Sequence, residues 1–178
     1  GVQGLQFNRN AAARMMDGTL LMGGANGFNH FDPDFVSMSN VQPNVVLTNF
    51  YLFNQLVEMG ENSILTKAIT YTDSIILEPD HSIFSISFSA LDFTAPDKNL
   101  YAYKLEGVNV DWVNTSSDNR LTSYTNLDPG LYHFRVRATN ADGVWSPHEA
   151  SLAITILPYW WQTQWFYTLL VMTIIIIL

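Results

Sequence analysis

The sequence predicts an all-β fold, a β-sandwich, followed at the C-terminal end by the start of a transmembrane helix. Three observations support this prediction. Apolar and polar residues alternate with a period of two in several short segments, as they do in strands with one buried face. Only 13% of the residues are charged and 13% are aromatic, whereas about 25% are charged in an average soluble domain. Residues 165–178 carry no charge at all.

The first part of the chain, up to about residue 34, is rich in glycine and asparagine. Two short apolar runs, 20–22 and 28–31, flank the pair Asn26 and Gly27. Asn-Gly between apolar runs predicts a β-hairpin, because a type I′ turn needs positive φ at both central positions. An isolated two-stranded hairpin is not stable, so we expect this one to belong to a larger upstream domain. Residues 35–43 then read as a linker.

From Val45 the pattern changes to short strands separated by turn signals. In residues 82–89, Phe84, Ile86 and Phe88 alternate with serines. A strand that is apolar on one face and serine-rich on the other favours a sandwich over a parallel sheet. Further strands are predicted over residues 45–53, 74–77, 100–107, 130–140 and 151–158. Around seven short strands at such intervals fit an immunoglobulin-like or fibronectin-type sandwich.

The apolar run 165–178 would form about 21 Å of helix, whereas the hydrocarbon core of a bilayer is about 30 Å thick. We therefore expect the start of a transmembrane helix that continues beyond this sequence. Trp160, Trp161 and Trp165 lie beside the run, and tryptophan prefers the membrane interface. No Lys or Arg follows Arg137, which predicts that the preceding domain lies outside the cytoplasm. A buried C-terminal helix of a soluble domain is the alternative.

A spaced set of aromatic, glycine and asparagine residues runs through the second half of the chain. It consists of Tyr103, Gly107, Trp112, Tyr124, Asn126, Leu127, Gly130, Tyr132, Phe134, Val136, Asn140, Gly143 and Trp145. This set resembles the Y_Y_Y domain, whose three name-giving tyrosines match Tyr103, Tyr124 and Tyr132. In that family the domain lies between a periplasmic β-propeller and the transmembrane helix of hybrid two-component sensors, mostly from gut Bacteroidetes.

The flanking segments agree with this resemblance. Residues 17–34 resemble the last unit of the two-component-regulator propeller, with the matching positions filled by Gly18, Leu20, Gly23, Gly24, Gly27, Phe31 and Pro33. Residues 158–165 resemble the pre-membrane segment of the same proteins. The resemblance therefore implies a final propeller-blade fragment over 1–37, a Y_Y_Y-like sandwich over 38–157, and a pre-membrane segment with a truncated transmembrane helix over 158–178.

Such a resemblance also implies a function. The parent would be a sensor histidine kinase with a receiver domain and often a DNA-binding output domain, and a glycan would bind mainly to the propeller. The segment itself would be a non-catalytic relay on the periplasmic side of the inner membrane, within a homodimer. Two other readings are open: a membrane-anchored carbohydrate-binding module, and a structural spacer domain of a surface enzyme.

Charge and composition exclude several kinds of function. The net charge is −8 and the eight basic residues are scattered, which argues against nucleic-acid binding, since that requires clustered basic residues. The closest pair, Arg135 and Arg137, reads as a solvated strand face. The chain has no cysteine, so disulfides, cysteine-based zinc sites and thiol nucleophiles are excluded. It begins with Gly1 and lacks a signal peptide, so we expect a fragment of a longer protein.

The sequence offers no catalytic, cofactor-binding or metal-binding site. The four histidines, His30, His81, His133 and His148, lack the spacing of metal ligands. There is no serine-nucleophile motif and no phosphate-binding loop. Trp112 and Trp145 are the remaining candidates. They could stack against sugars, but packing in the core or at a sheet edge is the simpler interpretation.

Overall fold

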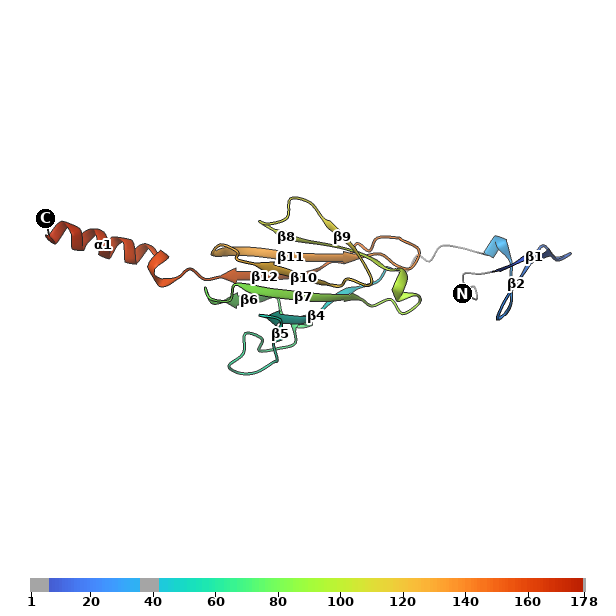
Figure 1. The fold of residues 1–178 in the computed structure, drawn as a ribbon, viewed down its shortest axis with the longest axis horizontal. Helices are drawn as coiled ribbons and strands as arrows, with labels where there is room; N and C mark the ends of the chain where they lie inside the picture. The colour runs from blue at the N-terminus through green and yellow to red at the C-terminus, as the bar shows by residue number, and fades with distance from the viewer. Residues whose placement is uncertain (1–6, 36–41, 178) are drawn as a thin grey trace. The chain divides into compact units, whose positions relative to one another are not determined.

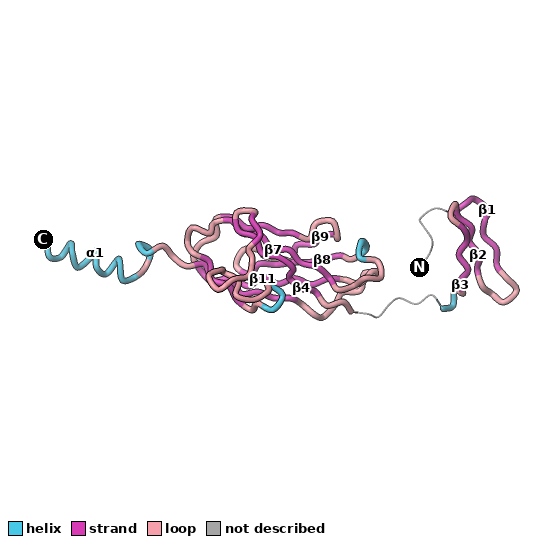
Figure 2. The backbone as a smooth tube through the Cα atoms, turned by 90° about the horizontal axis from the view of Figure 1, so that it is seen from below, coloured by secondary structure: helices cyan, strands magenta, loops and turns pink. Residues whose placement is uncertain are grey.

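A computed structural model describes residues 7–35 and 42–177, which belong to two compact units, Gly1–Ser39 and Asn40–Leu178 (Figures 1 and 2). The predicted boundary between residues 37 and 38, the first residues of the chain and most of the predicted linker lie outside the described residues. The two units are described separately below.

The first unit is a three-stranded antiparallel sheet in the order β1-β2-β3. Its strands are β1 (Phe7–Arg14), β2 (Leu20–Gly24) and β3 (Gly27–Phe31), and the short 3-10 helix η1 (Pro33–Phe35) follows. The predicted hairpin corresponds to β2 and β3, but the strand β1 was not predicted. A propeller blade has four strands, so assignment of this sheet to a propeller remains a prediction.

The hairpin turn differs from the predicted one. Gly24 pairs with Gly27, so the two central residues are Ala25 and Asn26, not Asn26 and Gly27. Gly27 nevertheless adopts a φ of +125°, a conformation that glycine tolerates and other residues rarely adopt. The expected positive-φ glycine is thus present, one position later in the turn.

The second unit contains the predicted β-sandwich. One sheet has the order β10-β7-β4-β5 and the other has the order β6-β12-β11-β8-β9. The strands are β4 (Val45–Leu52), β5 (Gln55–Leu56), β6 (Ser74–Leu77), β7 (Ile83–Ala90), β8 (Leu100–Glu106), β9 (Val113–Ser116), β10 (Leu121–Thr125), β11 (Gly130–Ala138) and β12 (Ala150–Ile156). Neighbours are antiparallel except β6 and β12, which pair in parallel.

The alternation along β7 explains how the two faces of its sheet differ. Phe84, Ile86 and Phe88 are almost fully buried between the sheets. On the opposite face, serine hydroxyls bond to neighbouring strands, as Ser85 does with Ser123 at 2.8 Å and Ser87 with Thr48 at 2.8 Å. These cross-strand hydroxyl pairs contribute to strand pairing without adding apolar surface.

The chain enters and leaves the sandwich at opposite ends (Figure 1). We call the end where β4 begins the upstream end; there Val45 pairs with Ala90. The downstream end is where β12 finishes, and there Ile156 pairs with Gly130. Between these ends β4 packs across the core against β11 and β12 of the other sheet.

Beyond β12 lie the 3-10 helix η4 (Trp160–Gln162) and the helix α1 (Gln164–Ile177). The predicted C-terminal helix is therefore present, and the side chains of α1 are largely exposed. Within residues 7–35 and 42–177, no helix combines the length and apolar character required to cross a membrane. The role of α1 as the start of a membrane span remains a prediction.

Candidate functional site

The connection between the sandwich and α1 is short and hydrogen-bonded. The Leu157 amide donates to the Leu77 carbonyl at 3.0 Å, so Leu157 is still tied to β6 one residue after β12 ends. The Tyr159 amide then donates to Gln162 Oε1 at 3.1 Å, and the Gln162 amide donates to the Tyr159 carbonyl at 2.8 Å. Only Pro158, whose φ is fixed by its ring, lies between these two anchored segments.

The tryptophans predicted to lie at a membrane interface form part of an aromatic cluster at this junction. Tyr159 stacks on Trp161 with ring centroids 4.4 Å apart, and Trp160 contacts Trp161 and Phe166 edge-on at 5.4 and 5.2 Å. The side chains of Trp160, Trp161 and Trp165 are all exposed. The cluster therefore presents aromatic surface to its surroundings, while its internal stacking stiffens the turn.

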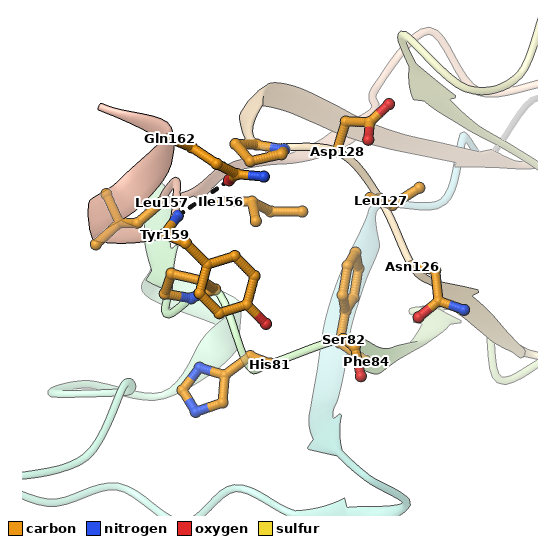
Figure 3. A pocket seen from close by; sticks show the side chains of 12 residues that line it. His81, Ser82, Phe84, Asn126, Leu127, Asp128, Ile156, Leu157, Tyr159 and Gln162 are labelled. Atoms are coloured by element: carbon orange, nitrogen blue, oxygen red, sulfur yellow. Dashed lines mark hydrogen bonds between the residues drawn. The ribbon is translucent and has the colours of Figure 1, made fainter. Parts of the chain in front are cut away.

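A cavity of about 230 Å³ lies at the downstream end of the sandwich. In Figure 3, Leu157, Tyr159 and Gln162 lie on one side of this cavity and Asn126 and Leu127 on the other. The remaining lining residues are Pro79, His81, Ser82, Phe84, Asp128, Pro129 and Ile156. The cavity thus separates the turn after β12 from the loops that begin β7 and β11.

Several residues of the predicted motif build the downstream end. The Tyr132 hydroxyl donates to the Asp128 carbonyl at 2.9 Å, the arrangement known as a tyrosine corner in immunoglobulin-like sandwiches. Gly107 has a φ of +95°, and a Cβ placed there would lie 3.2 Å from Tyr132 Cδ1. Asn126 adopts a φ of +52° while its amide donates to the Ser82 carbonyl. Gly130 pairs with the last residue of β12.

Other motif residues lie in the core. Phe134 and Val136 are fully buried, and the ring of Phe134 lies 6.3 Å from Tyr103 and 6.4 Å from Tyr124. Burial raises the pKa of Tyr124 to about 12, because a phenolate is poorly stabilised in an apolar environment. Leu127 packs at the edge of this core. These residues hold the sheets together and offer no ligand site.

Asn140 and Gly143 shape the turn after β11, at the upstream end. Asn140 Oδ1 accepts hydrogen bonds from the amides of Asp142 at 3.0 Å and Val144 at 2.9 Å, and Gly143 adopts a φ of +80°. The nearby carboxylate of Asp92 accepts hydrogen bonds from the amides of Thr94 and Ala141. The hydrogen bond from the Thr94 amide is the main cause of the lowered pKa of Asp92.

The last two motif residues, Trp112 and Trp145, lie on the outer face of the five-stranded sheet. The guanidinium of Arg137 lies 4.4 Å from the ring centroid of Trp112 and 4.8 Å from that of Trp145. The sequence predicted that Arg137 lies on an outer strand face. It did not predict that Trp112 and Trp145, which lie in loops, contact this arginine. Neither tryptophan is a core residue, and both belong to one surface cluster.

The described part of the chain contains no group of three or more His, Cys, Asp or Glu residues able to hold a metal ion. Two local arrangements are candidate functional sites. One is the junction at the downstream end, and the other is the Trp–Arg–Trp cluster, formed by Trp112, Arg137 and Trp145, on the outer face.

Comparison with known proteins confirms the resemblance to the Y_Y_Y domain. Residues 92–157 match the Y_Y_Y domain. The chain is 34% identical over 165 residues to histidine kinase P4 of Formosa agariphila, an alignment that covers 92% of this chain and 12% of that kinase. The chain thus spans a small part of this relative.

Two solved structures from B. thetaiotaomicron are also similar. The extracellular domain assigned to the hybrid two component system BT3049 has 28% sequence identity and a TM-score of 0.67, covering 88% of this chain and 21% of that one. The corresponding domain of BT4673 has 29% identity and a TM-score of 0.62, covering 84% of this chain and 20% of that one. Both similarities include more of this chain than the 92–157 match.

Proposed function

Because residues 92–157 match the Y_Y_Y domain and the chain is similar to parts of sensor proteins, we propose that it is the signal-relay segment of a two-component sensor. In this proposal an upstream propeller binds a glycan, and the sandwich passes the resulting displacement to a membrane helix and a cytoplasmic kinase. The segment itself carries out no catalysis.

The observation that carries this proposal is that no flexible linker separates the sandwich from the turn at the downstream junction. The anchored Leu157 is separated from the hydrogen-bonded turn at Tyr159 by Pro158 alone. A flexible linker would absorb displacement, whereas this junction contains no run of unconstrained residues. The chain also enters and leaves the sandwich at opposite ends, so a displacement has to pass through the packed core.

The proposal also covers the limits of the domains, the contact with the membrane and the assembly into a homodimer. Residues 1–37 would be the last blade of the propeller, 38–157 the sandwich, and 158–178 the segment that begins the membrane span. The uncharged helix α1 and the exposed tryptophans before it suit an interface between water and lipid. We place the sandwich on the periplasmic side, in a homodimer that brings two such helices together.

The test is to insert six residues of Gly and Ser after Leu157 in the full-length protein and to measure ligand-dependent kinase output. A rigid relay predicts that output no longer responds to ligand. The same insertion after Glu61, in an exposed loop, is the matched control and should leave the response intact. An unchanged response to the insertion after Leu157 would refute the relay.

The dimer is tested separately by sedimentation of residues 38–157 across a concentration series. A concentration-dependent dimer supports a sandwich that contributes to association. A strict monomer at high concentration assigns association to the propeller or to the membrane helix.

A further inference from the structure

Arg137 is fixed between two indole rings on the outer face of the five-stranded sheet. Its guanidinium lies 4.4 Å from the Trp112 centroid and 4.8 Å from the Trp145 centroid. Two such contacts restrict the position of the guanidinium, because cation–π attraction favours placement over the ring face. Ala102, its cross-strand neighbour on β8, is fully buried under this cluster.

The hydrogen-bonding groups of Arg137 have no acceptor among the described residues. Its Nε is buried and lacks a partner, and no hydrogen bond or ion pair joins its side chain to residues 7–35 or 42–177. Arg135, two residues earlier, differs in this respect: it bonds to Glu106 at 2.9 Å and to Glu149 at 2.7 Å. Glu106 and Glu149 are thus engaged by Arg135, whereas the described contacts of the Arg137 guanidinium are with the two aromatic rings.

A surface groove of about 470 Å³ shares Trp145 with this cluster. Its lining residues are Leu100, Tyr101, Asn114, Thr115, Ser116 and Trp145. Trp145 and Leu100, which are 38% and 49% exposed, supply apolar surface, while the exposed Asn114 and Ser116 supply amide and hydroxyl groups.

The strand register places the groove and the arginine side by side. Asn114 pairs with Ala102 across β9 and β8, and Ala102 pairs with Arg137 across β8 and β11. Asn114 and Arg137 therefore occupy one row on the same face, two strand spacings or about 10 Å apart. Trp112 and Trp145 flank the arginine end of this row.

We propose that this surface binds an acidic saccharide chain. The apolar C–H face of a sugar ring would pack on Trp145 and Leu100, its hydroxyls would bond to Asn114 and Ser116, and its carboxylate or sulfate would pair with Arg137. Aromatic surface with a few placed polar groups is the usual composition of a small-ligand site, and the planar guanidinium fork matches an oxyanion. This site is independent of the relay.

A saccharide fits this surface better than a peptide does. A peptide that extended the sheet would bind through the open backbone edge of β9, the edge strand of this sheet. Leu100, Asn114 and Ser116 of this groove lie on the outer face of the sheet, and the amide and the hydroxyl can both donate and accept hydrogen bonds. The polar groups of a sugar are likewise donors and acceptors distributed around a ring.

The test uses the 178-residue chain in a polyoxyethylene detergent, which carries no sugar, with calorimetry at 0.15 M salt. The probes are a galacturonate hexamer, its methyl ester, a sulfated galactan hexamer and hexaglutamate. We expect binding of at least one acidic sugar. The sugar that binds shows whether the site takes a carboxylate or a sulfate. We expect R137Q to weaken it by at least about tenfold and N114A to weaken it without altering the circular dichroism spectrum.

The matched control is R120Q, which removes one positive charge on the outer face of the other sheet, where Arg120 bonds to Ser89. Because salt screens distant charges, R120Q should leave the affinity unchanged within about twofold. Three results would overturn the proposal: binding of neither acidic sugar, equal loss with R137Q and R120Q, or binding of the methyl ester or hexaglutamate as tight as that of the acidic sugars.

Discussion

Replacement of Gly107 by alanine tests how the downstream end is built. Gly107 has a φ of +95°, and a left-handed conformation costs a residue with a Cβ about 1–2 kcal/mol. The new Cβ would also lie 3.2 Å from Tyr132 Cδ1 and 3.4 Å from Cε1. Tyr132 is tied to the Asp128 carbonyl and cannot shift freely, so crowding adds about 1 kcal/mol or more. We expect Gly107→Ala to lower the free energy of unfolding by about 2–3 kcal/mol.

Gly143→Ala is the matched control for this prediction. Gly143 has a similar φ of +80°, but no atom lies within 4 Å of a Cβ placed there. We therefore expect a loss of only about 1–2 kcal/mol, measured by urea unfolding followed by circular dichroism. In a Tyr132→Ala background the cost of Gly107→Ala should fall to that of Gly143→Ala, since the double mutant removes the crowding. Equal costs of the two alanine replacements in the wild-type background would refute the argument from Tyr132.

Three further predictions concern the motif residues. Tyr132→Phe removes the hydrogen bond to Asp128 and should lower the unfolding free energy by about 0.5–1.5 kcal/mol, measured by the same urea titration. Phe134→Ala empties the centre of the core and should cost about 3–5 kcal/mol, and a loss below 1 kcal/mol would show that the core is not packed as described. The pKa of Tyr124 is raised to about 12, so the folded state retains this proton when the unfolded state, near pH 10, begins to lose it. Stability should therefore fall as the pH rises from 10 to 12, and Tyr124→Phe should make this fall smaller in thermal melts recorded at each pH.

The strands that the sequence predicted are those whose inward residues are all apolar. The predicted bounds of β6 agree with the structure, and β7 differs from its prediction by one residue at each end. The strands β5, β9 and β10 were missed for identifiable reasons. β5 has two residues, and β9 is a short edge strand with the polar sequence Val-Asn-Thr-Ser. In β10 the inward positions are Thr122 and Tyr124 while Leu121 is exposed, which conceals the apolar alternation.

The surface cluster could not be predicted because it depends on loops. Period-two alternation places Arg137 on an outer face, and the structure agrees. Trp112 and Trp145, however, lie outside the named strands, where no periodicity fixes the direction of a side chain. The isolated pairing of Trp145 with Thr139 brings the indole back beside β11, and it depends on the tight turn at Gly143. Only the folded turn reveals that both indoles contact the arginine.

Under the relay proposal, the packing of the sandwich decides where displacement emerges. The ring of Phe134 lies 6.3 Å from Phe88 and 6.4 Å from Tyr124, so aromatic contacts join the two sheets. Close-packed interiors have low compressibility, and a push on β4 is therefore carried to β12 without being absorbed in the core. The cavity beneath Tyr159 and Gln162 interrupts this close packing at the downstream end. The hydrogen bonds of Leu157 and Tyr159 nevertheless continue past this cavity, so the turn leading to α1 is the element whose position a displaced sandwich would change.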